Sequence, residues 1–307
     1  MTDTETRPGR AGVTITLDDD SATDPAVTGT KGAGLAALHR AGFDVPDAVV
    51  LPVDAAAGWV AGPAPRELRR SVDAACERIG GPFAVRSSAT WEDGSSQAHA
   101  GITTTVLDVN DGEDVLGAIR RCLDETAAAA ARIGLLGETA IVIQRLVPAE
   151  WAGVAFTADP LTGDGEVVRI AASAGLGEAL VQGDVIGEDI VVRGDTIESA
   201  SPDEAPLALP PEHIRAIADV ARRVEEHFGA PQDIEWAIVD GRLWLLQVRP
   251  ITVLPIEPTY PEGNNWQKDV AHYPEPLTPF GWSILEHCGG EVPRVFDDLG
   301  LLVRGLE

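Results

Sequence analysis

The 307-residue sequence has few cysteines, only two lysines and no long hydrophobic run, and each shortage excludes a class of protein. The three cysteines, Cys76, Cys122 and Cys288, are far apart and odd in number, which argues against a disulfide framework and a metal cluster. No apolar stretch approaches the roughly 18 residues that a membrane span needs. Residues 1–12 are polar and lack the hydrophobic core of a signal peptide. We therefore expect a soluble, cytoplasmic protein.

Positive charge is also scarce, because 23 lysines and arginines face 49 acidic residues, for a net charge of −26. Such a field repels the phosphates of nucleic acids and anionic membrane surfaces, so neither is an expected partner. It also repels a nucleotide. A nucleotide site in this chain would therefore require a local group of cations together with a metal ion.

One of the two lysines, Lys31, lies in the glycine-rich segment AVTGTKGAGLAAL. A P-loop has the spacing G-x-x-x-x-G-K-[ST]. Here Lys31 stands between Gly29 and Gly32 and no hydroxyl residue follows it, so the spacing excludes a P-loop. What remains is a glycine-flanked lysine at the start of an apolar helix, which we expect from about Gly32 to Ala41.

Hydrophobic periodicity predicts an α+β chain that is rich in hairpins, without the regular alternation of a doubly wound sheet. Turn residues bound most of the expected elements. We expect helices at 64–80, 112–134 and 211–229, strands at 45–53, 82–90, 103–109 and 139–147, and hairpins at 188–199 and 232–252.

The last hairpin, 232–252, carries an acid, an amide and a guanidinium among apolar residues. Strand alternation puts Gln247 and Arg249 on one face, and folding about the Asp-Gly turn brings Glu235 roughly opposite residues 246–247. Such groups need partners when they are buried. A carboxylate suits Mg²⁺ and an arginine suits a phosphate oxygen. The alternative is a solvated outer face with an incidental ion pair.

Two neighbouring segments also carry polar groups that suit phosphates. PFAVRSSAT delivers Arg86 into a run of hydroxyl residues, which suits a polyphosphate but is also typical of a strand that ends in a polar turn. HAGITTTVLDV, which contains Gly101 and Thr105, suits a loop over phosphates or the threonine-rich edge of a hairpin.

Two weaker candidates follow. Gln144 lies in an apolar strand whose end could bind an adenine edge, or it is a core residue. Glu178 in SAGLGEAL follows two glycines, a pattern more typical of a tight turn than of a nucleotide fingerprint. The six histidines show no metal-ligand spacing.

Taken in order, five segments resemble the nucleotide-binding domain of the phosphoenolpyruvate synthase and pyruvate phosphate dikinase family, to which rifampin phosphotransferase also belongs. The likeness runs from about residue 27 to 253. The matching segments are GTKGAGLAALHRAGFDVPDAVVL, FAVRSSATWEDGSSQAHAG, VIQRLVPAEWAGVAFTADPLTG, AGLGEALVQG and QDIEWAIVDGRLWLLQVRPIT.

The resemblance implies a two-lobed ATP-grasp fold that closes on ATP and Mg²⁺. It implies that Lys31, Arg86 and Arg249 hold phosphates as the catalytic cations and that Glu235 and Gln247 bind the metal. It also implies roles in ATP binding for a further set: Thr105, Gln144, Leu146 and Glu178, with Gln144 and the backbone near Leu146 beside adenine.

The resemblance also divides the chain. We expect a disordered N-terminus at 1–12, an N-terminal lobe at 13–110, a C-terminal lobe at 111–254 and a linker-like extension at 255–307.

Family members split ATP into AMP and phosphate while one phosphoryl group passes to a histidine on a swivelling domain. Residues 1–307 carry no segment of the carrier-histidine type, so the resemblance implies a separate partner protein with that histidine. The sequence also departs from the family pattern at Ile102 and Thr103, where two amides are typical, and at Ala171, where asparagine is common. The alternative function is therefore an ATP-binding or sensing module without turnover.

Overall fold

The computed structural model describes residues 13–59, 61–91, 104–132, 134, 138–175, 187–199 and 208–254. The chain separates into two compact units, Met1–Pro255 and Ile256–Glu307, and all described residues belong to the first. The predictions for 1–12, for the loop that holds Gly101, for Glu178 and for 255–307 lie outside the described residues.

Five antiparallel strands form a first sheet in the order β1-β2-β5-β3-β4. The middle strand, TAIVIQR, is rich in β-branched residues and apolar on both faces, as expected for a strand that is covered on both sides. The strands are β1 (Ile15–Thr16), β2 (Ala48–Leu51), β3 (Phe83–Ala89), β4 (Thr105–Val109) and β5 (Thr139–Arg145).

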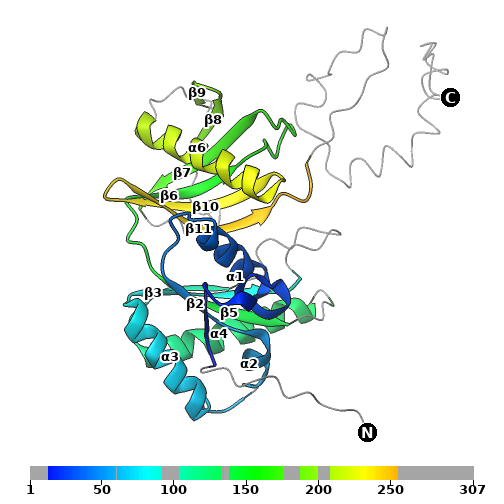
Figure 1. Cartoon of the computed structure of the whole chain (residues 1–307), viewed down its shortest axis with the longest axis vertical. Helices are drawn as coiled ribbons and strands as arrows, with labels where there is room; N and C mark the ends of the chain where they lie inside the picture. The colour runs from blue at the N-terminus through cyan, green and yellow to red at the C-terminus, as the bar shows by residue number, and fades with distance from the viewer. Residues whose placement is uncertain are drawn as a thin grey trace, which may run out of the picture. The chain divides into compact units, whose positions relative to one another are not determined.

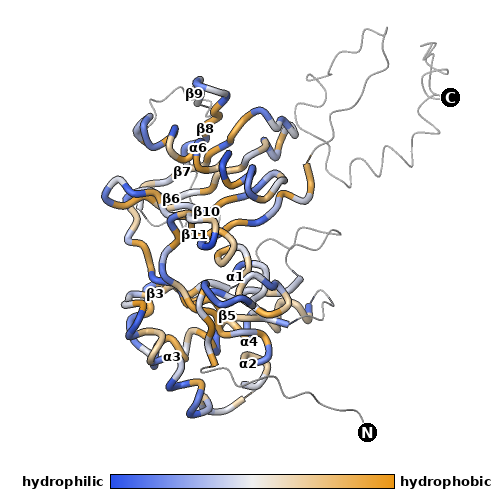
Figure 2. The backbone as a smooth tube through the Cα atoms, in the orientation of Figure 1, coloured by the Kyte–Doolittle hydropathy of each residue, from blue (hydrophilic) through white to orange (hydrophobic). Residues whose placement is uncertain are grey.

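Two helices, α3 (Arg66–Ile79) and α4 (Gly112–Arg132), cover one face of this sheet. In α3 the buried residues Leu68, Val72 and Ile79 recur at helical spacing and belong to one hydrophobic cluster with Val85 and Ile143 of the sheet. Figure 2 shows hydrophobic stretches along the strands and hydrophilic ones on α3. The amphipathic pattern therefore orients the helix.

A second antiparallel sheet of six strands has the order β11-β10-β6-β7-β8-β9. Helix α6 (Pro211–Phe228) covers one of its faces (Figure 1), beginning at a proline and ending before Gly229, which has a left-handed φ of 69°. The strands are β6 (Trp151–Phe156), β7 (Val167–Ala174), β8 (Glu188–Arg193), β9 (Thr196–Ser199), β10 (Gln232–Val239) and β11 (Arg242–Pro250).

Helix α1 (Pro25–Arg40) contacts β3 and β5 of the first sheet and β11 of the second (Figure 1). Leu35 of α1, Ile217 of α6 and Trp236 of β10 belong to one continuous hydrophobic cluster. Two short elements flank the helix: a 3-10 turn at Asp20–Thr23 and α2 at Val53–Ala57. Because α1 touches both sheets, residues on it can reach groups on either one.

The α+β class and the two-lobed arrangement are as predicted, and the lobe boundary at residue 110 stays a prediction. Strand β5, which comes after that residue, is the middle strand of the first sheet, and helix α4 packs on the same sheet. The chain passes from the first sheet to the second between Arg145 and Trp151, where it leaves β5 and enters β6. None of the helices in the described ranges combines the length and the hydropathy that crossing a lipid bilayer requires.

Candidate functional site

The glycines around Lys31 allow α1 to approach both sheets closely. A Cβ at Gly29 would lie 2.0 Å from the carbonyl oxygen of Ser88 on β3, and a Cβ at Gly34 would lie 2.9 Å from the carbonyl oxygen of Val248 on β11. Gly29 also has a φ of 67°, so the helix is kinked there. Lys31, two residues later, is only 8% exposed. The glycine-rich segment therefore packs a lysine between the two lobes.

Arg86 projects from β3 towards the second lobe. It pairs across the sheet with Val142 of β5 and with Thr105 of β4, and cross-strand partners lie on the same face. Its Nη1 donates to the carbonyl oxygen of Leu246 at 3.2 Å, and its Nη2 contacts the carboxylate of Glu235. Arg86 thus joins the first sheet to the last hairpin.

The last hairpin contains a bulge that decides which residues share a face. From the turn up to Trp236 the pairing is regular and would place Glu235 opposite Leu246. A shift between Glu235 and Trp236 instead pairs Glu235 with Gln247. Without the shift Gln247 would point to the α6 side, because a slip of one residue reverses the faces. The bulge therefore gathers the acid, the amide and the arginine on the side that faces Arg86.

The sequence analysis missed Asp233, which precedes Glu235 by two residues and lies on the same face. It pairs with Arg249, whose Nε donates to its Oδ2 at 2.6 Å, and it is 8% exposed. The alternation that placed Gln247 beside Arg249 would have placed Asp233 beside Glu235. Two arginines, Arg86 and Arg249, therefore contact two carboxylates, Glu235 and Asp233.

The two carboxylates have shifted pKa values in opposite directions. Burial raises the pKa of Glu235, but the contact with Arg86 and the charges of Lys31 and Arg249 outweigh it, so its pKa is lowered overall. For Asp233 burial prevails over the charge and hydrogen bond of Arg249, and Glu235 adds repulsion, so its pKa is raised. Lys31 of α1 is thus among the cations that lower the pKa of Glu235 on the second sheet.

Several buried polar atoms in this region have no hydrogen-bond partner among the described residues. They are Nε2 of Gln144, Oε1 of Gln247 and Nε of Arg86. Gln144 pairs with Ala84, two residues from Arg86 along β3, so both side chains lie on the face towards α1. Leaving such groups unpaired costs about 1–3 kcal/mol each. A ligand with both donors and acceptors would satisfy them.

Glu235 and Gln247 are suited to Mg²⁺, because that ion takes oxygen ligands from one or two carboxylates and from substrate phosphates. The unpartnered Oε1 of Gln247 lies on the strand directly opposite Glu235. The described residues contain no group of three or more histidine, cysteine or acidic residues arranged for a metal ion. The donor set therefore fits a metal that shares its ligands with a substrate.

The remaining candidate residues of the first sheet differ in whether their polar groups are already bonded within the protein. The amide of Leu146 donates to the carbonyl oxygen of Pro82 at 2.8 Å, so it is already used within the protein. The hydroxyls of Ser87 and Ser88 bond to backbone groups of Thr104 and of α1 and are not directed at a ligand. Thr105 pairs with Arg86 and lies on the same face.

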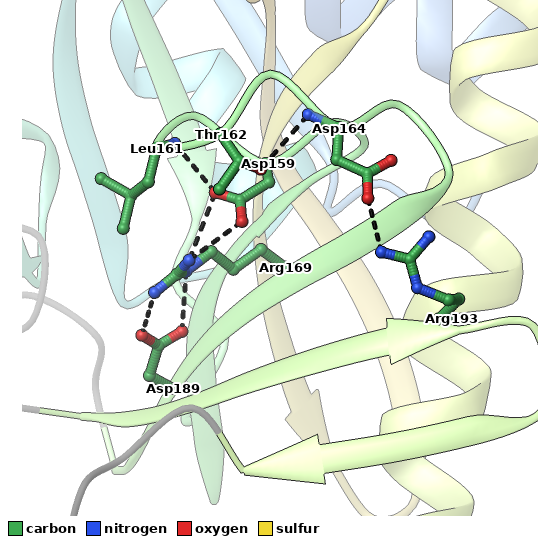
Figure 3. A network of polar contacts seen from close by, with 7 residues as sticks. All are labelled: Asp159, Leu161, Thr162, Asp164, Arg169, Asp189 and Arg193. Carbon is green, nitrogen blue, oxygen red and sulfur yellow. Dashed lines mark hydrogen bonds and ion pairs between the residues drawn. The ribbon is translucent and has the colours of Figure 1, made fainter. Parts of the chain in front are cut away.

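A second polar cluster, which the sequence did not indicate, lies on the second sheet and holds the loop after β6 (Figure 3). Arg169 of β7 donates from Nε to Asp189 at 3.0 Å and from Nη1 to both oxygens of Asp159, at 3.2 and 3.1 Å. Asp159 also accepts from the amide of Leu161 at 2.8 Å. Because Arg169 is bonded on both sides by carboxylates, the cluster anchors the loop to strands β7 and β8.

Sequence comparison supports the resemblance to known enzymes. The chain is 38% identical over 220 residues to a probable phosphoenolpyruvate synthase of Methanothermobacter thermautotrophicus, covering 60% of this chain and 32% of that protein. It is 34% identical over 214 residues to a rifampicin phosphotransferase of Bacillus cereus, covering 60% of this chain and 25% of that protein. The chain thus spans between a quarter and a third of these relatives.

Among solved structures, D-alanine–D-alanine ligase from Bacillus anthracis complexed with ATP matches 72% of this chain and 52% of its own, with 12% identity and a TM-score of 0.36. This likeness is too low to carry an argument.

The model of the family described as "Pyruvate phosphate dikinase, AMP/ATP-binding domain" matches residues 58–205 and 194–264. These ranges include β3, β10 and β11, which supply Arg86, Asp233, Glu235, Gln247 and Arg249. The match extends over more than half of the sequence, and the chain therefore belongs to the family of pyruvate phosphate dikinase AMP/ATP-binding domains.

Proposed function

We propose that this chain is the ATP-binding part of an ATP-dependent phosphotransferase that phosphorylates a histidine on a swivelling domain. The observation that carries the proposal is that Arg86 of β3 and Arg249 of β11 contact two buried carboxylates, with the buried Lys31 of α1 as a third cation whose charge acts on Glu235. Such a group of cations is what a triphosphate requires inside a chain with a net charge of −26.

Each side chain has a role that follows from its chemistry. Lys31 and Arg86 bind phosphate oxygens, and Asp233 orients Arg249 towards the same region. Glu235 and Gln247 would hold Mg²⁺, which neutralises phosphate charge when it is bound. Arg86 contacts Glu235 directly, so an incoming triphosphate competes with that carboxylate for the guanidinium. Catalysis then consists of positioning and charge neutralisation.

The resemblance supplies the reaction that we propose. Both phosphoanhydride bonds of ATP break and AMP leaves: one phosphoryl group forms a bond to a histidine nitrogen of the partner, which loses its proton, and water takes the other phosphoryl group to give phosphate. Phosphoenolpyruvate synthase and rifampicin phosphotransferase differ in their named acceptors, so the acceptor beyond the histidine is not set by this domain.

The first test is the nucleotide product. The protein is incubated with ATP, Mg²⁺ and the histidine-bearing swivelling domain of a phosphoenolpyruvate synthase, and the products are followed by phosphorus NMR. We expect AMP and phosphate only when the partner is present. Tight ATP binding without AMP under every condition would support the alternative, an ATP-binding module without turnover, which the residues Ile102 and Thr103 favour.

The substitution Glu235→Gln tests the assignment of the site. It keeps the size of the side chain but removes the charge that faces Arg86. We expect turnover to be lost in a protein that still folds, with a lower thermal unfolding temperature because the buried Arg86 loses its carboxylate partner. The matched control is Glu198→Gln at an exposed glutamate on β9 of the same sheet, which should keep wild-type turnover. Wild-type rates in Glu235→Gln would contradict the proposal.

A further inference from the structure

Ser88 connects the kink of α1 to the first sheet. Its side chain is fully buried on β3. Its hydroxyl donates to the carbonyl oxygen of Thr28 at 2.7 Å and accepts from the amide of Gly32 at 3.1 Å. These two backbone groups lie on either side of Gly29, the residue with non-helical geometry. One hydroxyl therefore bridges the kink.

The kink needs such a partner because it creates a helix start inside the protein. Amide groups in the first turn of a helix have no acceptor within that helix. Gly32 lies in the first turn after the kink, and Ser88 supplies its acceptor from another strand. The carbonyl of Thr28 ends the turn before the kink, and Ser88 supplies its donor. A hydroxyl meets both needs because it donates and accepts at once.

This bridge brackets the lysine of the candidate site. Lys31 is adjacent to Gly32 and lies between the two bonded backbone groups. Ser88 and Arg86 are two residues apart on β3 and so project to the same face. The side chain of Thr30 adds a second link, donating to the carbonyl oxygen of Ala89 at 3.3 Å. Strand β3 thus carries both Arg86 and the contact that locates Lys31.

We propose that Ser88 is a positioning residue for phosphate binding, which acts by holding the kink so that Lys31 is presented on the side of β3 that carries Arg86. The proposal rests on the proposed function, because it assumes that these two cations bind the phosphates of ATP. It makes Ser88 act through Lys31 and not through contact with the nucleotide.

The test is a double-mutant cycle of Ser88→Ala and Lys31→Ala, read as ATP affinity by calorimetry. Alone, Ser88→Ala should weaken ATP binding about tenfold, since the buried amide of Gly32 and carbonyl of Thr28 lose their partner and the kink relaxes. In the Lys31→Ala background the same change should weaken binding less than about twofold, because residues that act as a unit are not additive. The wild type and Ser88→Ala should bind adenosine, which lacks phosphates, with equal affinity.

The matched control is Ser87→Ala. Ser87 is also fully buried on β3 and also both donates to and accepts from one backbone segment, that of Thr104, but it faces away from α1. The Ser87→Ala variant should bind ATP like the wild type.

If Ser88→Ala proves too unstable to purify, Ser88→Cys is the second test variant. It keeps the size of the side chain but is a weaker hydrogen-bond donor, so it should lose ATP affinity in the same way but to a smaller extent.

The outcomes separate the two proposals. Equal losses of ATP and adenosine affinity, or a tenfold loss that persists without Lys31, would show that Ser88 only supports the fold. If Lys31→Ala weakens ATP binding but both Ser88 variants bind ATP like Ser87→Ala, the inference about Ser88 fails and the proposed function stands. A wild-type protein that binds no ATP would overturn both.

Discussion

At the scale of single residues, the site combines charges that are costly to bury. The side chains of Arg86 and Glu235 are only 12% and 16% exposed, and each is the partner of the other. Removing one member of a buried pair leaves the other charge without compensation, which costs more than the pair contributes. The ion pair is therefore a condition for keeping either charge inside the molecule.

Arg86→Ala should lower the free energy of unfolding by about 3 kcal/mol, because Glu235 is left buried and unpaired. The double variant Arg86→Ala/Glu235→Gln should recover part of this loss, since no charge is then unpaired. Urea unfolding followed by circular dichroism gives both values. The control is Arg193→Ala, whose side chain is 57% exposed in its pair with Asp164 (Figure 3) and which should leave stability nearly unchanged. Equal effects of both arginine substitutions would contradict the argument.

The two described cysteines should be chemically inert. Burial, followed by the charges of Asp73 and Asp111, raises the pKa of Cys76 to about 11, and burial together with Glu125 raises that of Cys122 to about 12. The thiolate is the reactive form, so at pH 8 these thiols should react with a disulfide reagent at least about 100-fold more slowly than free cysteine.

Cys288 lies outside the described residues and is replaced by serine for this measurement. Unfolding in urea should restore ordinary rates, because it removes the burial. Reaction at the rate of free cysteine in the folded protein would contradict the raised pKa values of the partly buried Cys76 and the buried Cys122.

At the scale of elements, α1 is the helix that the two sheets share, and its glycines set how closely it approaches them. Gly34 faces the backbone of Val248 on β11, and Gly29 faces that of Ser88 on β3. A helix normally gains stability when an interior glycine becomes alanine. Contact with a rigid backbone reverses that expectation, since neither the strand nor the helix can move without disturbing the other.

Two glycine-to-alanine substitutions with opposite expected effects on stability test this point. Gly34→Ala should destabilise the protein by about 1–3 kcal/mol, because the new Cβ would lie 2.9 Å from the carbonyl oxygen of Val248. Gly117→Ala on α4, where nothing lies within 4 Å of an added Cβ, should stabilise it by about 0.5–1 kcal/mol. Thermal unfolding distinguishes them, and a stabilising Gly34→Ala would mean that α1 does not pack against β11.

At the scale of the whole molecule, a body with a net charge of −26 surrounds a small region where cations outnumber carboxylates. The excess charge repels itself across the surface, and salt screens that repulsion. The Arg86–Glu235 ion pair inside the site is screened much less, because both side chains are largely out of contact with water. Salt should therefore weaken the charge repulsion across the surface while the ion pair in the site persists.

The unfolding temperature should consequently rise with salt. Between 0.01 and 0.15 M KCl the screening length falls from about 30 Å to about 8 Å. We expect an increase of about 3 °C, which corresponds to about 1 kcal/mol for a chain of this size. Differential scanning calorimetry measures it, with an equal osmolarity of sucrose as the uncharged comparison. A temperature that is constant or falls with KCl would contradict the prediction.

The sequence by itself determined the fold class, most helices and strands, and the residue types that the candidate site can contain, because these depend on local patterns. Turn residues and alternation placed the last hairpin, and Lys31, Arg86, Glu235, Gln247 and Arg249 were identified from their residue types and segments. The roles of these residues towards ATP remain predictions.

Only the tertiary structure decided how these segments meet. Three features depend on partners distant in the chain. They are the bulge that pairs Glu235 with Gln247, the position of β5 within the first sheet with α4 packed on it, and the hydrogen bond that engages Leu146. The bridge from Ser88 to α1, some 60 residues away, also depends on such a partner. Periodicity reports which face of a strand or helix is apolar, but not which distant segment covers that face.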